Sequence, residues 1–460
     1  MRVRKGPAPT PRIDGPQGPA VTLPNGRELT LTRRHFLYGV AGVAALALAG
    51  AGAAYGAGQS RDSDGTATLT VPTSAVVSSN DFEDMKDVDA PVAAATTIKL
   101  PFGSLVWVCD DDIGACLLPT ETGKPLVEVG LLDLKAGKCT TVLKHAVAED
   151  EGFEVYDVRA NRAGAIWTEA DIIDGLWRVY GAKRTKKGLG KPQLLDEGDA
   201  DWEMPTLACA GDYGYWQRLP QLEGNARIED SLLQRAAFGS AEGEVVYASE
   251  GRMACAPSSS GSDIIATPRA SASGTYYQMT RIDGTSGAVT DACVLPTSMK
   301  PMECSYGPTG FTFAFDGIYS YGDGIANLGT YLPLNPVTTT LAERPADEAA
   351  DDHAIAIEQA NPATKAYSDG TWFHFARDPR SAPAWCGPWM IVRSQTNLCA
   401  VDRENRRVYP LPRENGADDY GDFIASTHLG TRAVSFSNID YTPIGGERQK
   451  YCLVKVWEQA

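Results

Sequence analysis

The stretch Leu105-Val106-Trp107-Val108 is the first of seven short apolar runs that recur along the chain and decide its fold. Short runs rich in aromatic and β-branched residues, bounded by turn-forming residues, are typical of β-strands. The intervals between successive runs are 60, 49, 49, 48, 60 and 63 residues, measured at Trp107, Trp167, Trp216, Ile265, Phe313, Phe373 and Phe436. A repeat of this length is typical of four-stranded units.

A second, hairpin-like pair of runs follows most of these markers. The bends fall at Ala136-Gly137-Lys138, Asp283-Gly284 and Arg403-Glu404-Asn405, and clusters of Asp, Asn and Gly favour tight turns. The pattern predicts an all-β chain, a β-propeller of about seven four-stranded blades. Six or eight blades, and a pair of β-sandwiches, are compatible with the same pattern.

The period and the outer hairpins resemble the blades of TolB-like and WD40-like propellers over about residues 100–457. The Trp-Asp and Gly-His signatures of strict WD40 repeats are absent. The resemblance implies the propeller fold and names no ligand. The 46 glycines, 29 prolines and 18 tyrosines also suit many short strands joined by turns.

The amino terminus contains a motif for export. Thr32-Arg33-Arg34-His35-Phe36-Leu37-Tyr38 resembles the twin-arginine translocation motif, with Tyr38 where lysine is common. Residues 36–57 carry no charge and are long enough to cross a bilayer as a signal or transmembrane helix. The resemblance implies that the twin-arginine translocase reads Arg33, Arg34, Phe36 and Leu37. We expect the domain outside the cytoplasm, held at the membrane by an uncleaved helix or secreted after cleavage.

These signals divide the chain into four segments. Residues 1–35 are a basic cytoplasmic region, residues 36–57 the helix, residues 58–95 a polar linker and residues 96–460 the propeller. An acidic stretch near residues 345–361 breaks the β pattern, and its acidic first turn predicts a short helical insertion between the fifth and sixth units.

Charge and cysteine content limit the possible partners. The chain has a net charge of −16; residues 1–58 carry +5, which leaves −21 for the rest. Nucleic-acid binding depends on Lys and Arg that neutralise phosphates, so we expect no nucleic-acid partner. All ten cysteines follow residue 58, which suits an oxidising compartment, and some disulfides are expected without a defined pairing.

The chain offers few candidates for a cofactor site. It contains no C-x-x-C pair and no histidine pair at helical spacing, so no zinc site is expected. Calcium is a candidate at Asp110-Asp111-Asp112 and at Asp196, Asp199 and Asp201, because Ca²⁺ prefers carboxylate oxygens. Acidic clusters in surface loops are in most proteins simply solvated, so we favour that explanation for both clusters, and no other cofactor is predicted.

We expect a binding or scaffolding protein rather than an enzyme. Six polar residues just beyond the predicted inner strands are candidate binding residues along one rim: Asp110, Glu169, Arg218, Arg269, Asp316 and Arg377. The expected partner is an envelope protein, a peptide or a glycan. The alternative is a secreted propeller enzyme, namely a hydrolase, a lyase or a cofactor-bearing oxidoreductase. No catalytic residue is assigned.

Overall fold

The computed structural model separates two units of the chain. In the first, residues 1–55, only the backbone of β1 (Ala20–Thr22) and β2 (Glu28–Thr30) is described, and the two pair antiparallel. In the second, the described residues are 68–69, 71, 73–119, 126–270, 275–297, 299–315, 329–336, 371–376, 381–394, 397–417, 421–426 and 429–460. The predicted twin-arginine motif, the helix at 36–57 and the insertion near 345–361 lie outside the described residues.

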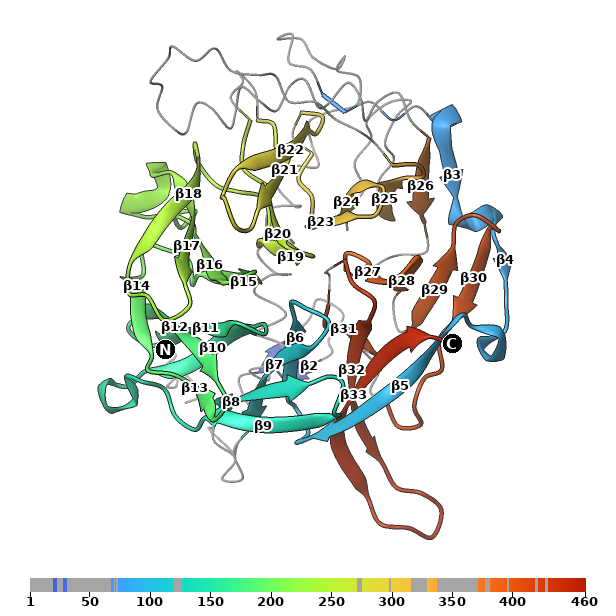
Figure 1. The fold of residues 1–460 in the computed structure, drawn as a ribbon, viewed down its shortest axis with the longest axis horizontal. Coiled ribbons are helices and arrows are strands. Elements are labelled where there is room, and N and C mark those ends of the chain that lie inside the picture. Colours follow the sequence, from blue (N-terminus) through green and yellow to red (C-terminus); the bar gives the residue numbers. More distant parts are fainter. Residues whose placement is uncertain are drawn as a thin grey trace, which may run out of the picture. The chain divides into compact units, whose positions relative to one another are not determined.

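The second unit is a β-propeller of seven sheets (Figure 1), which confirms the predicted fold class. Blade 1 contains β6 (Leu105–Val108), β7 (Ile113–Pro119), β8 (Leu126–Asp133) and β9 (Lys138–Leu143). Blade 2 contains β10 (Glu154–Ala160), β11 (Gly164–Asp171), β12 (Leu176–Thr185) and β14 (Gln193–Gly198), with the short β13 (Gly188–Leu189) beside β12. Blade 3 contains β15 (Thr206–Ala210), β16 (Tyr213–Arg218), β17 (Ser231–Ala237) and β18 (Gly243–Ser249).

The next three blades follow the same order from the innermost strand outward. Blade 4 contains β19 (Ser258–Ser260), β20 (Asp263–Ala266), β21 (Gln278–Asp283) and β22 (Val289–Val294). Blade 5 contains β23 (Glu303–Gly307), β24 (Gly310–Phe315), β25 (Gly329–Pro333) and β26 (Trp372–Phe375). Blade 6 contains β27 (Ala384–Cys386), β28 (Trp389–Arg393), β29 (Leu398–Asp402) and β30 (Arg407–Pro410).

Blade 7 closes the ring with strands from both ends of the propeller. It contains β31 (Phe423–Ile424), β32 (Ala433–Tyr441) and β33 (Gln449–Gln459), and β5 (Val92–Leu100) is its outermost strand. The blue β5 runs beside the red β33 in Figure 1. Because β5 leads directly into β6 of blade 1, the last blade is joined to the first through the pairing of β5 with β33.

The residues before β5 add two short strands to the outer edges of blades 5 and 6. We call residues 73–91 the strap. Its strand β3 (Val76–Ser78) pairs parallel with β26 of blade 5, and its strand β4 (Glu83–Asp84) pairs parallel with β30 of blade 6. Phe82 of the strap is buried, and its ring centroid lies 5.2 Å from that of Phe373. The predicted polar linker at 58–95 therefore includes three propeller strands or parts of strands, and the predicted boundary at 96 falls inside β5.

The aromatic markers lie mostly on the second strand of a blade rather than on the innermost one. Trp167, Trp216, Ile265, Phe313 and Phe436 occupy β11, β16, β20, β24 and β32. The sixth marker, Phe373, does not begin a sixth blade, because it lies on β26, the fourth strand of blade 5. The predicted number of blades is nevertheless right, because Trp385 and Trp389 begin a blade of their own in the sequence that follows.

The predicted outer hairpins are confirmed, and they share one turn chemistry. Each joins the third and fourth strands of a blade, and each begins with an aspartate whose Oδ1 accepts backbone N–H groups of the turn. Asp133 binds Ala136 N at 2.8 Å, Asp283 binds Ser286 N at 2.6 Å and Asp402 binds Asn405 N at 2.9 Å. Such Asp-capped turns set the register of the strands that they join.

Alternating strand directions place the connections on two faces of the ring. We call the upper face the end at which the innermost strand of each blade begins and the second strand ends. The lower face is the end at which the innermost strand ends and the third strand ends. Connections between successive blades, and those between second and third strands, therefore lie on the upper face.

Candidate functional site

The six candidate rim residues do not all lie on one face. Glu169, Arg218 and Arg269 lie at or just beyond the ends of β11, β16 and β20, on the upper face. Asp110 follows the innermost strand β6 and therefore lies on the lower face. Asp316 and Arg377 lie outside the described residues.

Glu169 is a buried structural acceptor. Its carboxylate accepts the backbone N–H groups of Val147 at 2.6 Å and Ala148 at 3.0 Å, and the indole N–H of Trp167 at 2.9 Å. The side chain is fully buried. Glu169 thereby fixes the connection between blades 1 and 2, residues 144–153, against the end of β11.

Arg218 joins blades 2 and 3 at the upper face. Its guanidinium lies 4.2 Å from the ring centroid of Trp202 and 3.5 Å from Oδ1 of Asp196. Oδ2 of Asp196 accepts the indole N–H of Trp216 at 2.8 Å and the amide N–H of Gln234 at 3.0 Å. Asp196 therefore serves as an acceptor for blade 3 rather than as a free carboxylate.

The triplet Asp110-Asp111-Asp112 stabilises the lower face. Asp110 accepts the N–H of Ile113 at 2.7 Å and that of Arg162 in blade 2 at 2.8 Å. Asp111 accepts N–H and O–H groups of Thr431 in blade 7, both at 2.9 Å. These bonds tie blade 1 to both neighbours. Within the described part of the chain, no group of three His, Cys, Asp or Glu side chains has a metal-binding arrangement.

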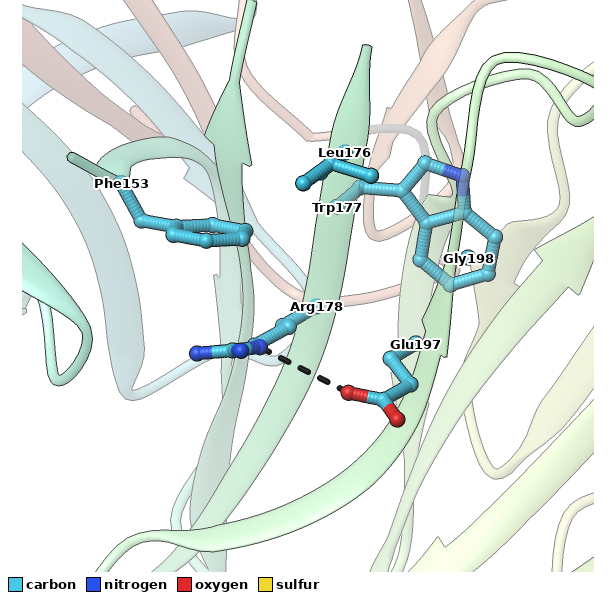
Figure 2. Close-up of a pocket in the computed structure, with 6 residues that line it drawn as sticks. All are labelled: Phe153, Leu176, Trp177, Arg178, Glu197 and Gly198. Carbon is cyan, nitrogen blue, oxygen red and sulfur yellow. Dashed lines mark ion pairs between the residues drawn. The ribbon is translucent and has the colours of Figure 1, made fainter. Parts of the chain in front are cut away.

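A shallow, open pocket of about 260 Å³ lies at the upper face of blade 2 (Figure 2). Three chain segments form it: the residue before β10, the start of β12 and the end of β14. Its lining consists of Phe153, Leu176, Trp177, Arg178, Glu197 and Gly198. The sequence contains no periodic signal for this set, because none of the six belongs to a recognisable motif.

Arg178 is the polar centre of this pocket. Its guanidinium lies 4.4 Å from the ring centroid of Phe153 and forms ion pairs with Glu151 at 2.8 Å and Glu197 at 3.6 Å. Figure 2 shows Arg178 between the Phe153 ring and the Glu197 carboxylate. Hydrogen bonding to Glu151 raises the pKa of Arg178, and the same bond lowers the pKa of Glu151.

Apolar side chains are exposed around the pocket and on blade 3 beside it. Ile173 is 95% exposed in the connection between β11 and β12, and Ile228 is 80% exposed in the connection between β16 and β17. Val147, Ile172 and Leu222 are also exposed on upper-face connections, and Leu176 is exposed at the upper end of β12. We call these six residues the apolar patch. Large exposed apolar groups gathered on one face are typical of interaction surfaces.

Direct contacts make the upper-face connections of blades 2 and 3 one continuous surface. Gly175, before β12, packs closely on Ala200, after β14: a Cβ atom added to Gly175 would lie only 2.8 Å from Cβ of Ala200. The N–H of Gln221 donates to the carbonyl of Asp201 at 3.0 Å. The N–H of Glu203 donates to the carbonyl of Leu219 at 2.9 Å. The loops that carry the apolar patch are therefore held against one another by backbone hydrogen bonds and close packing.

The two described histidines and the ten cysteines do not form a recognisable catalytic group. His145 Nδ1 lies 3.3 Å from Glu149 and is exposed, and the His374 ring stacks on Tyr331 at 4.2 Å. No disulfide joins any of the ten cysteines in the structure, so the expected disulfides remain a prediction. The sulfurs of Cys116 and Cys139 lie 3.7 Å apart. Hydrogen bonding between the two thiols raises the pKa of Cys116 and lowers that of Cys139.

Comparison with known proteins found similar solved structures at low sequence identity. No protein-family model and no curated protein matches it. The WD40 domain of SCAP from fission yeast has a TM-score of 0.40 at 6% identity, over 79% of this chain and 97% of that chain. A post-proline cleaving enzyme from Rickettsia typhi has a TM-score of 0.41 at 9% identity, over 76% of this chain and 52% of that chain.

A third similar structure, the dihydro-heme d1 dehydrogenase NirN, has a TM-score of 0.37 at 9% identity, over 86% of this chain and 80% of that chain. The chemistry of these proteins is not transferred to this chain. Among the described residues, no helix is both long and apolar enough to cross a membrane.

Proposed function

We propose that the chain is an envelope-exposed binding or scaffolding propeller, exported by the twin-arginine route, which docks a partner protein on the upper face of blades 2 and 3. The observation that carries this proposal is the apolar patch, because its six exposed apolar side chains all lie at the upper face. Burial of such side chains against a partner is favourable by about 25 cal/mol per Å² of apolar surface.

Charge around the apolar patch favours a basic partner segment. The exposed acidic residues of these connections are Glu149, Asp150, Glu151, Asp174, Glu197, Asp199, Glu223, Glu229 and Asp230. The exposed cations there are Lys144 and Arg227. Complementary charge increases the rate of encounter and suppresses unsuitable partners. The expected partner therefore offers apolar side chains flanked by Lys or Arg.

The binding surface is preorganised by the fold. The connections are fixed by the Glu169 hydrogen bonds, the Arg178 ion pairs and the Arg218–Trp202 contact. A rigid surface loses little conformational entropy on binding, which favours recognition of a defined partner. Exposed apolar residues on loops carried by a rigid scaffold are the usual place for recognition in such proteins.

Site-specific photo-crosslinking in cells tests this proposal. A photoreactive amino acid replaces Ile173 or Ile228 on the upper face, and Leu429 on the lower face is the control position because it is also exposed. We expect a discrete protein adduct from both upper-face positions and none from Leu429. Equal labelling at the two faces, or no adduct at either upper-face position, contradicts the proposal.

Charge-reversal variants identify what holds the adduct. Asp174→Lys with Glu223→Lys reverses two exposed carboxylates beside the apolar patch, and Glu242→Lys with Glu404→Lys makes the same change on lower-face turns. The upper-face pair should weaken adduct formation at Ile173, whereas the lower-face pair should not. An equal effect of both pairs would show that net charge, rather than this surface, governs the interaction.

A further inference from the structure

Three cations gather at the upper rim of blade 4, although the domain around them is acidic. Arg252 lies between β18 and β19, Arg269 between β20 and β21, and Lys300 between β22 and β23. All three connections belong to the upper face. Residues after 58 carry a net charge of −21, so a local excess of positive charge is unusual here.

Arg252 is held in place by two partners from neighbouring connections. Its guanidinium donates to the carbonyl of Pro220 and to the carboxylate of Glu203. The Arg252 side chain is 19% exposed. These bonds fix the Arg252 guanidinium at the rim and use only part of its five N–H donors.

Arg269 packs against the backbone next to Arg252. A Cβ atom on Gly251 would lie 3.2 Å from Nη1 of Arg269 and 3.5 Å from its Cζ. The Arg269 Nε is buried and has no hydrogen-bond partner among the described residues. No described carboxylate lies within ion-pair distance of the Arg269 guanidinium.

Lys300 is half-buried on the upper-face connection between β22 and β23, and its ammonium group interacts electrostatically with both arginines. Within the described residues its ammonium group has no ion pair. Burial lowers the pKa of Lys300, the charges of Arg252 and Arg269 lower it further, and Glu203 and Cys255 partly offset the shift. The three cations therefore repel one another, and a bound anion would relieve that repulsion.

We propose that Arg252, Arg269 and Lys300 form a binding site for the phosphate group of a ligand at the upper rim of blade 4. With the Glu203 carboxylate included, the cluster carries a charge of +2, which matches a phosphate dianion. The planar guanidinium groups offer paired donors for phosphate oxygens, and the ammonium group adds a point charge. None of the three cations belongs to the apolar patch, so substitution of Arg269 or Lys300 tests phosphate binding without changing a residue of the proposed docking surface.

Isothermal titration of the full chain, purified in detergent, with inorganic phosphate at constant ionic strength tests this site. Chloride replaces phosphate in the reference titration. A phosphate group can also belong to a lipid, so a second arm measures binding to phosphatidylcholine vesicles with and without phosphatidic acid. We expect saturable binding in at least one arm, and the arm that responds identifies the source of the phosphate.

Substitution of the two cations that form no ion pair with a described residue shows where phosphate binds. Arg269→Met and Lys300→Met should each weaken binding by about tenfold or more, because each removes a charge-assisted contact. The control, Lys186→Met with Lys187→Met, removes two exposed cations from the turn between β12 and β13. Absence of binding in both arms, or binding that survives Arg269→Met and Lys300→Met in folded protein, overturns the proposal. Circular dichroism verifies that each variant is folded.

Discussion

The indole of Trp177 lies directly over Gly198. A Cβ atom on Gly198 would lie 2.1 Å from Cζ2 of Trp177 and 2.5 Å from its Cε2. Trp177 is 1% exposed, and Figure 2 shows its ring packed at the Gly198 backbone. The absence of a side chain at position 198 thus allows β12 and β14 to approach and sets one wall of the pocket.

We predict that Gly198→Ala displaces the Trp177 ring and destabilises the propeller by about 1–3 kcal/mol, because the site has no space for a methyl group. Urea unfolding, followed by tryptophan fluorescence, measures the change. The control is Gly446→Ala in the exposed β32–β33 turn, where the closest neighbour is a Pro443 side-chain atom at 3.3 Å. Equal stabilities of Gly198→Ala and wild type would show that the close contact is absent.

The second prediction concerns the contribution of the strap to the stability of the propeller. Phe82 is 6% exposed and packs on Phe373, whereas Val88 in the same segment is 82% exposed. Phe82→Ala should therefore lower the free energy of unfolding by about 3 kcal/mol, and Val88→Ala should leave it nearly unchanged. Chemical denaturation of both variants measures the difference. If Phe82→Ala is as mild as Val88→Ala, residues 73–91 do not contribute to the propeller core.

Glu303 gives the folded protein a dependence on pH. Burial raises the pKa of Glu303 to about 7, although the N–H of Ala382 and the charge of Arg393 favour its ionised form. The folded state therefore keeps a proton that the unfolded state releases near its ordinary value of 4.5. Stability is complete below pH 4.5 and falls as the pH rises toward 7, by roughly 1.4 kcal/mol for each unit of pKa difference.

We accordingly predict that Glu303→Gln is more stable than wild type at pH 8 and that this advantage shrinks at pH 5. Glutamine does not titrate and can still accept the N–H of Ala382. Denaturation curves at the two pH values measure the difference. The same stability gap at both pH values would mean that Glu303 is not the titrating group.

Export provides a prediction that concerns the amino terminus alone. Replacement of Arg33 and Arg34 by Lys keeps the charge and removes the paired arginines that define the twin-arginine motif. We expect the protein to accumulate in the cytoplasm, as measured by fractionation and immunoblotting. A matched pair, Arg2→Lys with Arg4→Lys, should leave export unchanged. Normal delivery of the Arg33 and Arg34 variant would exclude the twin-arginine route.

Much of the ring could be predicted from local sequence. Hairpins such as β8–β9 and β21–β22 carry their own turn residues, so Asp133 and Asp283 identify them without knowledge of the fold. The strap could not be predicted in this way. Its strands β3 and β4 are very short, and each pairs with a strand nearly 300 residues or more away in the chain, so their order depends on a completed ring.

The candidate site was less accessible from the sequence. Asp110 and Glu169 were identified by type, but one ties neighbouring blades on the lower face and the other fixes a connection on the upper face. Phe153, Arg178 and Glu197 come together because β10 and β12 begin, and β14 ends, at the upper face of blade 2. One local signal was available, since Ile172 and Ile173 lie between Asp171 and Asp174 and thus place apolar side chains in a turn.

Covalent footprinting of the protein in its native envelope tests the central claim most directly. Side chains of the intact protein are labelled with a photogenerated carbene in the envelope and again after purification, and mass spectrometry compares the two. We predict that Ile173, Leu176 and Ile228 are protected in the envelope, whereas Leu429 and Val245 are labelled equally in both samples. Equal labelling of Ile173, Leu176 and Ile228 in the two samples would contradict a docking surface at blades 2 and 3.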